Sequence, residues 1–505
     1  MNFARSMQAA LLLILAASQG PPARADDALT RTVDGRNFDA FVLTTLQDYA
    51  VPGAVVVVTD AERTVFLKGY GVRRAGGSEP VDADTRFQVA SIAKFIAATA
   101  VARLVDRGVV SWDAPVRSFS PETALAVPYA TENASLRDYL AHRTGLPAYG
   151  GDLLTQLGYS SGELARRARF LAFDKSFRER WAYSNYGIFL GQHAAAQAAG
   201  LTPPELLVTE VLRPLAMTRS GPTRSTLFED ENRAAAQDVD GTIMPNEDVD
   251  AFSGGGAVVS TGADIAHWMR MLLAEGSFEG HQILSKAAID QMFASSMVQG
   301  VGGPLHDPND SAGLGCESYH FLRYRIIEKN GALNGVRTIV TLIPERRIGI
   351  AVFANKQLTV FPEAVRAEFL ERELGPSGQD LQADIRGQQA AWNTLVDVPK
   401  PPADAKPLAR DLGAFTGRYE SPLYGAMAVE RSGEALALKI GPNAYPGYLA
   451  HWSADTFLLT FPNPDVAPGL LTFAFPAGAT EAAAVDGSQV PNAFTTNYGH
   501  FDRAR

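Results

Sequence analysis

The segment Ser91-Ile92-Ala93-Lys94 constrains this chain more than any other short stretch. A serine and a lysine three residues apart on a helix lie on the same face, one turn from each other. The amine is then within reach of the hydroxyl, which is one way to make a serine nucleophilic without a histidine. Tyr183-Ser184-Asn185 and Lys329-Asn330-Gly331 follow in the order that S-x-x-K chemistry uses. The fold is therefore expected to bring three distant segments to one place.

The order of the predicted secondary structure indicates a layered α/β domain with a helical insertion. Residues 51–73 are predicted to form two strands, and a helix is expected from about Ser91 to Arg107. Residues 135–300 look mostly helical, and Asp264–Leu273 is predicted as an amphipathic helix with Ser260 or Thr261 as its cap. Later strands are predicted at Phe321–Ile327, Val336–Ile343 and Ile348–Phe353. Strands at both ends of this region suggest a single sheet that is closed by strands from the two ends of the domain.

The first residues have the pattern of a secretory signal peptide. Arg5 supplies the positive start, Ala9–Ala17 the apolar run, and Ala23-Arg24-Ala25 an A-x-A cleavage site. The run is too short to span a bilayer, and no later segment of the sequence is apolar enough. An uncleaved N-terminal anchor is the alternative. We expect a signal peptide over residues 1–25, a periplasmic or secreted mature protein, and no membrane insertion after its removal.

Composition divides the rest of the 505-residue chain into three parts. The main domain is predicted over residues 26–375. Residues 376–409 begin with Pro376-Ser377-Gly378 and end in a proline-rich stretch, which is typical of a linker. Beyond them, short apolar segments alternate with Gly, Pro and Asp, which predicts a small all-β, barrel-like domain over residues 410–505.

The composition and motif content exclude several function classes. The formal net charge of −10 argues against nucleic acid or anionic lipid as a partner. Cys316 is the single cysteine of the sequence, so an internal disulfide is excluded. The sequence lacks a G-x-S-x-G elbow, an H-E-x-x-H or paired-cysteine metal signature, and a G-x-G-x-x-G loop. Its eight histidines are scattered, His142 in a predicted loop among them. We expect neither a metal nor another cofactor.

Ser91 and Lys94 are the candidate nucleophile and base. Ser91 should begin a helix, where its backbone N–H can help to stabilise an oxyanion. The alternative for Ser91 is an ordinary N-cap serine. Lys94 must be neutral to accept a proton, and burial or a second cation lowers the pKa of a lysine. Lys329 could be that cation if its strand lies beside the helix.

The two other motifs supply candidate partners. Tyr183 carries a phenol that can pass a proton between nucleophile and leaving group, and Asn185 can hydrogen-bond both a substrate carbonyl and Lys94. An aromatic-rich loop that packs on its own helix is the alternative. Lys329-Asn330-Gly331 is expected to end a strand, although the same residues are also typical of a surface turn. Gly331 would let the substrate backbone approach closely, and the N–H of Ala332 would be a second oxyanion donor.

Together these motifs resemble those of the beta-lactamase-related serine hydrolases, which include penicillin-binding proteins, class C beta-lactamases, esterases and D-amino-acid peptidases. The resemblance spans about residues 36–375. It implies an antiparallel beta-lactamase/transpeptidase-like sheet flanked by helices, with a helical subdomain. Further similar segments are His142-Arg143-Thr144-Gly145-Leu146-Pro147, Leu212-Arg213-Pro214-Leu215-Ala216-Met217 and Gly254-Gly255-Gly256-Ala257-Val258-Val259-Ser260-Thr261. The tail resembles a small barrel domain that is often appended to such hydrolases.

This resemblance also implies roles for the motif residues. Ser91 would form an acyl-enzyme, and Lys94 and Tyr183 would share the role of base. Asn185 and Lys329 would position the substrate. Many esterase-like and peptidase-like relatives carry histidine where this chain has Lys329. Lysine is the penicillin-recognising variant, so it implies a preference for a substrate carboxylate.

We therefore expect a serine hydrolase that acts on amide or ester bonds of a small molecule or short peptide. Peptides with unusual or D residues and small esters are the leading substrates. The alternatives are a D-Ala carboxypeptidase or a beta-lactamase, and a penicillin-binding sensor or scaffold that is acylated without turnover. The sequence leaves open the leaving group, the D or L preference, the oligomeric state and the role of the C-terminal domain.

Overall fold

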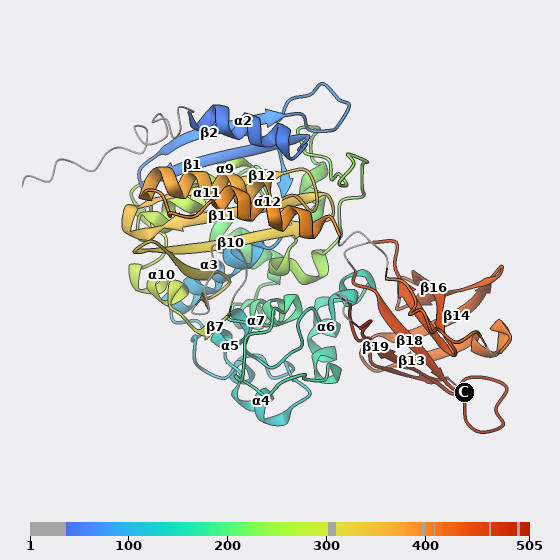
Figure 1. The fold of residues 1–505 in the computed structure, drawn as a ribbon. Coiled ribbons are helices and arrows are strands. Elements are labelled where there is room, and N and C mark those ends of the chain that lie inside the picture. The colour runs from blue at the N-terminus through green and yellow to red at the C-terminus, as the bar shows by residue number, and fades with distance from the viewer. Residues whose placement is uncertain are drawn as a thin grey trace, which may run out of the picture.

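A computed structural model of the chain shows a large antiparallel sheet with helices on both faces and a barrel beside it (Figure 1). It describes residues 37–300, 310–394, 399–408, 410–463, 466–491 and 495–504. The predicted signal peptide lies outside the described residues. Within the described ranges, no helix combines the length and hydropathy that crossing a bilayer requires.

The large sheet carries the strands predicted from both ends of the main domain. Over the described residues it has eight strands in the order β2-β1-β12-β11-β10-β9-β8-β7. The strand bounds are β1 Gly53–Asp60, β2 Thr64–Gly71, β7 Met297–Val298, β8 Ser311–Ala312, β9 Glu317–Phe321, β10 Tyr324–Leu333, β11 Val336–Ile343 and β12 Ile348–Ala354. Because β1 pairs with β12, the N-terminal strands join the C-terminal ones near one edge of the sheet. Shorter strands pair separately: β3 Phe87–Gln88 with β4 Val259–Ser260, and β5 Ser277–Phe278 with β6 His281–Gln282.

One strand prediction was wrong. Phe321–Ile327 was expected to be a single strand, but the chain turns between the end of β9 and the start of β10. Leu322, at this turn, has φ of 54° and is half exposed. A leucine rarely adopts this left-handed conformation. The segment also lacks Gly, Pro and Asn, so the sequence carries no signal of a turn here. The Lys329 motif consequently lies within β10, close to its end, rather than at the end of an earlier strand.

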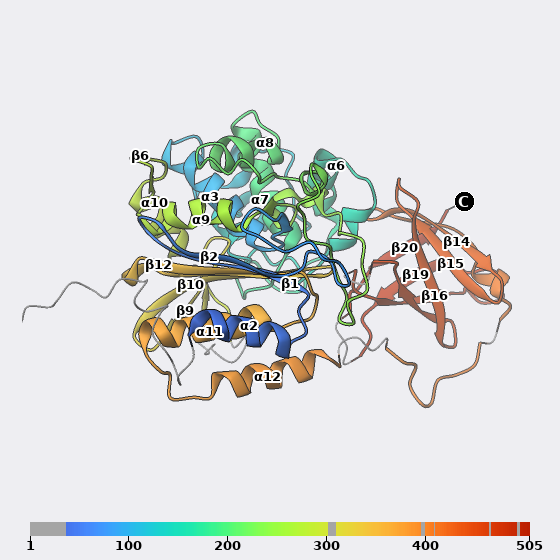
Figure 2. The same ribbon diagram turned by 90° about the horizontal axis from the view of Figure 1, so that it is seen from above.

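Helices cover both faces of the sheet, as Figure 2 shows. Helices α2, α11 and α12 lie on one face, and α3, α9 and α10 lie on the other. The helix bounds are α2 Phe38–Asp48, α3 Ile92–Asp106, α4 Pro128–Asn133, α5 Leu136–Leu140, α6 Ser161–Arg167, α7 Asn185–Ala198, α8 Pro203–Leu207, α9 Gly262–Leu273, α10 Lys286–Phe293, α11 Phe361–Leu374 and α12 Leu381–Trp392. Thr261 caps α9 by accepting a hydrogen bond from the backbone N–H of Asp264, as predicted. The antiparallel sheet flanked by helices confirms the predicted fold class.

Helix α3 agrees with the helix predicted from Ser91 to Arg107, and it is buried almost all round. Every residue from Ile92 to Ala102 is buried, which is typical of a helix inside a core rather than at a surface. Lys94 belongs to this run and is 0% exposed. Burying a lysine in this way penalises its charged form, so the fold itself begins to change the chemistry of this amine.

The stretch predicted as a linker contains helix α12. Leu381 and Ile385 of this helix are buried. The side chain of Gln389 accepts a hydrogen bond from the N–H of Val360 at 3.0 Å and donates one to the carbonyl of Leu358 at 2.8 Å. These contacts attach α12 to the segment that leads into α11.

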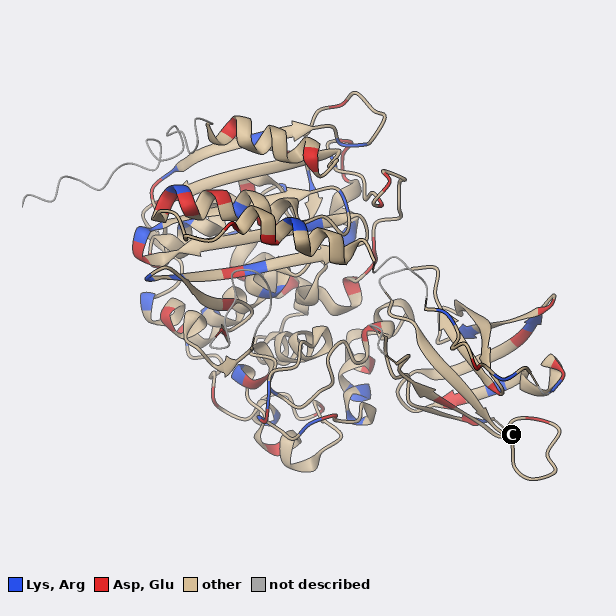
Figure 3. Ribbon diagram, in the orientation of Figure 1, with Lys and Arg blue, Asp and Glu red and all other residues tan. Residues whose placement is uncertain are grey.

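The C-terminal part is a closed barrel, as the short apolar segments predicted. Over the described residues it consists of β13 Gly417–Ser421, β14 Gly425–Ser432, β15 Ala435–Ile440, β16 Tyr445–Ser453, β17 Thr456–Thr460, β18 Gly469–Ala474, β19 Ala484–Ser488 and β20 His500–Arg503. Pairing of β13 with β20 closes the ring. Figure 3 shows Lys and Arg interspersed with Asp and Glu in both the sheet part and the barrel.

Loops of the barrel contact the main domain at separate points. The Tyr159 hydroxyl donates to the carbonyl of Tyr424 at 3.0 Å. On another loop, Asn463 donates to Glu247 at 3.1 Å and accepts a hydrogen bond from Asn334 at 2.7 Å. Asn334 lies in the turn between β10 and β11. The barrel therefore reaches the turn that directly follows the Lys329 motif.

Candidate active site

Ser91 lies at the start of α3, at a sharp change of chain direction. The preceding residue, Ala90, is buried and has φ of 51°, and such strain in a non-glycine residue is often found at functional sites. The Ser91 side chain makes no capping hydrogen bond to α3. Its Oγ instead accepts hydrogen bonds from Lys94 Nζ at 2.9 Å and from the Tyr183 hydroxyl at 2.8 Å. The alternative of an ordinary N-cap serine therefore does not fit the structure.

Lys94 is a buried amine directed at the Ser91 hydroxyl. Its Nζ also donates to the carbonyl of Gly255. Burial lowers the pKa of Lys94; Tyr183 opposes this effect, and the ammonium of Lys329 lowers the pKa further. A lower pKa increases the fraction of neutral amine at a given pH. Burial and the Lys329 ammonium thus shift the pKa of Lys94 in the direction that a base needs.

Tyr183 lies between the two lysines. Its ring centroid is 5.0 Å from Lys94 Nζ and 5.0 Å from Lys329 Nζ. Burial by itself raises the pKa of Tyr183, but Lys329, Lys94 and the hydrogen bond to Ser91 outweigh it, so the pKa lies below the ordinary value. A phenol with a lowered pKa both accepts and returns a proton more readily near neutral pH.

An aromatic cluster holds the Tyr183 ring in place. The rings of His142, Tyr149 and Trp181 lie 4.8, 5.4 and 5.9 Å from it. His142 Nδ1 accepts a hydrogen bond from the N–H of Ser184 at 3.1 Å. Burial, together with Lys329 and Lys94, holds the pKa of His142 well below its usual value. His142 is therefore a neutral packing partner of the site.

Asn185 is the first residue of α7 and has a different partner from the one expected. Its Nδ2 donates to Oδ2 of Asp152 at 2.7 Å, whereas Lys94 bonds to Ser91 and Gly255. The other carboxylate oxygen, Oδ1, is buried and has no hydrogen-bond partner among the described residues. Burial raises the pKa of Asp152 from 3.8 to about 7, against the opposing effects of Asn185 and Lys94. Sequence reasoning did not identify Asp152, because an isolated aspartate in a loop carries no motif.

Lys329 extends from β10 toward the same place and is ion-paired. Its Nζ lies 2.7 Å from Oε1 of Glu317, the first residue of β9. The lysine side chain is 3% exposed and that of Glu317 is 15% exposed. Burial lowers the pKa of Lys329, but Glu317 and Tyr183 raise it by more, so the net shift is upward. Lys329 is therefore a permanent cation beside Tyr183.

Gly331 follows Lys329 on the same face of β10 and leaves space for Ser91. A Cβ at this position would lie 2.9 Å from the backbone nitrogen of Ser91 and 2.9 Å from Cβ of Ala90. Such distances are too short for a side chain, so glycine allows β10 to approach the start of α3. The Lys-Asn-Gly motif is thus part of a strand, and the surface-turn alternative does not hold.

The backbone of Ala332 has the orientation that a second oxyanion donor needs. Leu333 pairs with Val336 across a two-residue turn. Backbone groups of an antiparallel strand face its two neighbours alternately, so Leu333 and Gly331 face β11 and Ala332 faces the opposite edge. On that edge, β9 ends its pairing with β10 at Glu328. The Ala332 N–H therefore points away from β11, past the end of β9.

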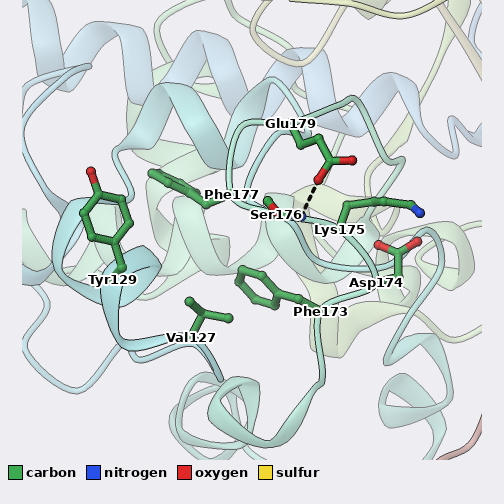
Figure 4. Close-up of a pocket in the computed structure, with 8 residues that line it drawn as sticks. All are labelled: Val127, Tyr129, Phe173, Asp174, Lys175, Ser176, Phe177 and Glu179. Atoms are coloured by element: carbon green, nitrogen blue, oxygen red, sulfur yellow. Dashed lines mark hydrogen bonds between the residues drawn. The ribbon is translucent and has the colours of Figure 1, made fainter.

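A hollow elsewhere on the surface is separate from this site. It has a volume of about 650 Å³ and is shown in Figure 4. Its lining residues are Val127, Tyr129, Phe173, Asp174, Lys175, Ser176, Phe177 and Glu179, and they include none of the motif residues. Within the described ranges, no group of three or more His, Cys, Asp or Glu side chains could hold a metal ion.

Comparisons with known proteins agree with this arrangement. Residues 38–374 match the family model described as Beta-lactamase, and residues 399–497 match a "Domain of unknown function (DUF3471)". "Unguisins hydrolase ungD'" of Aspergillus campestris is 24% identical over 78% of this chain and 77% of its own length. "D-alanyl-D-alanine-carboxypeptidase/endopeptidase AmpH" of Escherichia coli K12 is 25% identical over 60% of this chain and 79% of its own length.

A solved structure shares the fold across both parts of the chain. The "octameric penicillin-binding protein homologue from Pyrococcus abyssi" superimposes with a TM-score of 0.59 at 20% identity, over 92% of this chain and 98% of the other. The likeness at this level of identity concerns the fold alone. Since the family model covers the entire large sheet and its flanking helices except α12, the chain belongs to the Beta-lactamase family.

Proposed function

We propose that the protein is a serine hydrolase that forms an acyl-enzyme on Ser91 and cleaves amide or ester bonds. The observation that carries this proposal is the position of the Ser91 hydroxyl between two proton-transfer groups, Lys94 Nζ at 2.9 Å and the Tyr183 phenol at 2.8 Å. Peptides with unusual or D residues, or small esters, are its expected substrates.

In the first step, Ser91 Oγ attacks the carbonyl carbon of the substrate while its proton passes to the neutral amine of Lys94 or to Tyr183. The carbonyl π electrons move to oxygen and give a tetrahedral oxyanion. The N–H groups of Ser91 and Ala332 stabilise this charge. The carbonyl then re-forms, the bond to the leaving amine or alcohol breaks, and the proton returns through Tyr183 to the leaving group.

In the second step, water attacks the acyl carbon of the ester on Ser91. The neutral amine of Lys94 or the phenolate of Tyr183 accepts the proton of the water, and the tetrahedral intermediate collapses with cleavage of the bond to Oγ. The serine oxygen takes the proton back, so the net products are a carboxylic acid and an amine or alcohol. Lys329 keeps the pKa of Tyr183 low through both steps.

The two curated relatives support hydrolysis, because their names describe a hydrolase and a carboxypeptidase/endopeptidase. A D-Ala carboxypeptidase or a beta-lactamase is the second candidate, and the observation that favours it is the Lys329 cation beside Tyr183. A protein that is acylated by penicillin but does not turn over is the third candidate.

We also propose that the chain is exported and cleaved after Ala25. Its partner is a small acyl substrate rather than a nucleic acid. N-terminal sequencing of secreted protein tests the cleavage site.

Steady-state hydrolysis of a 4-nitrophenyl ester tests the proposal. The wild-type protein should release many equivalents of nitrophenol per molecule, and the Ser91→Ala variant should lose this activity. Ser160→Ala, which changes a serine at the cap of α6 instead, is the matched control and should remain active. A single equivalent of nitrophenol would indicate a binder without turnover, and full activity of Ser91→Ala would refute the serine mechanism.

A further inference from the structure

The ion pair between Lys329 and Glu317 bears on which substrates the site accepts. A lysine that recognises a substrate carboxylate needs an ammonium that can turn to it. Here the ammonium is 2.7 Å from Glu317, and both side chains are largely removed from water. The two residues belong to adjacent strands, since Glu317 pairs directly with Glu328, the neighbour of Lys329. The pair is thus held by the sheet rather than by flexible loops.

The remaining charges of the site offer a carboxylate little attraction. Lys94 is buried with a lowered pKa, and His142 has a pKa well below its usual value. Arg325 lies four residues before Lys329 on the same face of β10, about 13 Å away along the strand, and its Nε donates to Ser318. Asp152 contributes a further carboxyl group. The described residues around Ser91 therefore present a cation that is already neutralised and an additional acidic group.

A substrate carboxylate could reach Lys329 only by competing with Glu317. Displacing Glu317 would break its ion pair with Lys329 while both side chains stay largely buried, and breaking a buried ion pair is costly. Sharing the ammonium would place two carboxylates close together, which is also unfavourable. A neutral ester or amide incurs neither cost.

We infer that this site selects acyl substrates that are neutral where they meet Lys329, and that Glu317 excludes substrates with a carboxylate there. This inference rests on the proposed serine hydrolase function and narrows its substrate class. It favours neutral esters and end-blocked peptides over penicillins and over peptides with a free carboxylate next to the scissile bond. On this inference Lys329 acts on Tyr183, in place of the carboxylate recognition that the family resemblance implies.

Two matched pairs of substrates test the inference, one for each side of the scissile bond. The first pair is the benzoylglycyl thioesters of thioglycolic acid and of thioglycolamide, which differ by a carboxylate on the leaving group. The second pair is 4-nitrophenyl glutarate and its methyl ester, which differ by a carboxylate on the acyl group. In at least one pair, wild-type kcat/KM should be higher for the neutral member by about tenfold or more. Preference for the charged member in either pair would overturn the inference.

The Glu317→Gln variant tests the cause of the selectivity. It keeps the size of the side chain and removes its charge, so the ratio of kcat/KM values should shift toward the charged substrate by about tenfold. Glu420→Gln, on the exposed face of the barrel, removes one charge far from the site and should leave the ratio unchanged. An unchanged ratio of kcat/KM values in Glu317→Gln would also overturn the inference. If this variant does not fold, the ratio measured for the wild-type protein still tests the inference.

The same assays separate the inference from the function on which it rests. Hydrolysis of the neutral substrates that persists in Ser91→Ala would refute the serine mechanism, whatever the ratios. Loss of that hydrolysis in Ser91→Ala, together with a wild-type preference for charged substrates, would refute the inference alone. Failure of every substrate to react with the wild-type protein would contradict both.

Discussion

The first turn of α3 and the end of β10 each place a buried lysine beside Tyr183, at equal distances from its ring. In α3, Lys94 has hydroxyl and carbonyl partners, and its pKa is lowered. In β10, Lys329 has the carboxylate of Glu317, and its pKa is raised. Two residues of one type in one site thus have pKa values shifted in opposite directions.

The difference shows that the partner, rather than burial, decides the charge of a buried amine. Both side chains are nearly inaccessible to water, so desolvation disfavours the ammonium form of each. The carboxylate of Glu317 reverses this effect for Lys329, whereas the hydrogen bonds of Lys94 go to a hydroxyl and a carbonyl. A neutral base and a fixed cation can therefore exist side by side, and the cation further lowers the pKa of the base.

Removing the neutral amine should have the largest effect. The Lys94→Met variant retains a buried, unbranched side chain but cannot accept the Ser91 proton, so kcat/KM should fall by about 10³-fold or more. The exposed Lys68→Met variant is a matched control, because Lys68 pairs with Asp39 on the surface. The kcat/KM for ester hydrolysis is measured for both variants, and circular dichroism checks that they fold. Near-normal activity of the Lys94→Met variant would show that Lys94 is not the base.

Removing the phenol that lies between the lysines should have a smaller effect. Tyr183→Phe keeps the aromatic packing against His142 and Tyr149 and removes the proton-transfer oxygen. We expect kcat to fall by about 10²-fold. Tyr149→Phe, which retains the neighbouring ring, is the control and should change kcat much less. Equal losses in the two variants would contradict a special role for Tyr183.

The pH dependence of activity tests whether Lys329 acts on Lys94 and Tyr183. Lys94 works as a base only when it is deprotonated, so its lowered pKa moves the rising limb of kcat/KM to lower pH. In a Lys329→Ala variant the pKa of Lys94 and that of Tyr183 should both increase. The rising limb should consequently move to higher pH, and kcat/KM below the limb should fall. A rate loss without any shift of the limb would mean that Lys329 contributes by contact alone.

Asp152 should make the smallest difference, in stability rather than rate. Its pKa is raised from 3.8 to about 7 on folding, so between these values the folded protein binds this proton more tightly than the unfolded chain does. The carboxyl therefore contributes stability at low pH, and this contribution is lost as the pH rises through about 7. Asp152→Asn should be less sensitive to pH across this range. Thermal unfolding at pH 5 and pH 8 measures the difference, and an identical pH response in both proteins would rule out the effect.

The sequence predicted those parts of the molecule that depend on local pattern. The buried helix after Ser91 and strands such as Val336–Ile343 follow from apolar periodicity, and the structure has them at or near the predicted positions. The three motifs also come together around Ser91, as their order along the chain indicated. Where a local signal was missing, the prediction failed, as at Leu322, where an apolar residue turns the chain.

The partners of the site residues could not be predicted in this way. Glu317 and Asp152 are single carboxyl groups in segments without a catalytic motif, and their role depends on which distant residue each one meets. Asn185 was expected to hydrogen-bond a substrate carbonyl and Lys94, but its Nδ2 donates to Asp152. Such pairings arise from tertiary packing between segments, and local propensity contains no information about them. The inferred preference for neutral substrates depends in the same way on the contact between Lys329 and Glu317.

Mass spectrometry of acid-quenched protein during turnover of a 4-nitrophenyl ester tests the central claim most directly. We predict one acyl group per molecule, located by peptide mapping on Ser91, in the wild-type protein. The adduct should be absent from Lys94→Met under the same conditions. An acyl group on another residue, or an equally rapid adduct on Ser91 in Lys94→Met, would contradict the account.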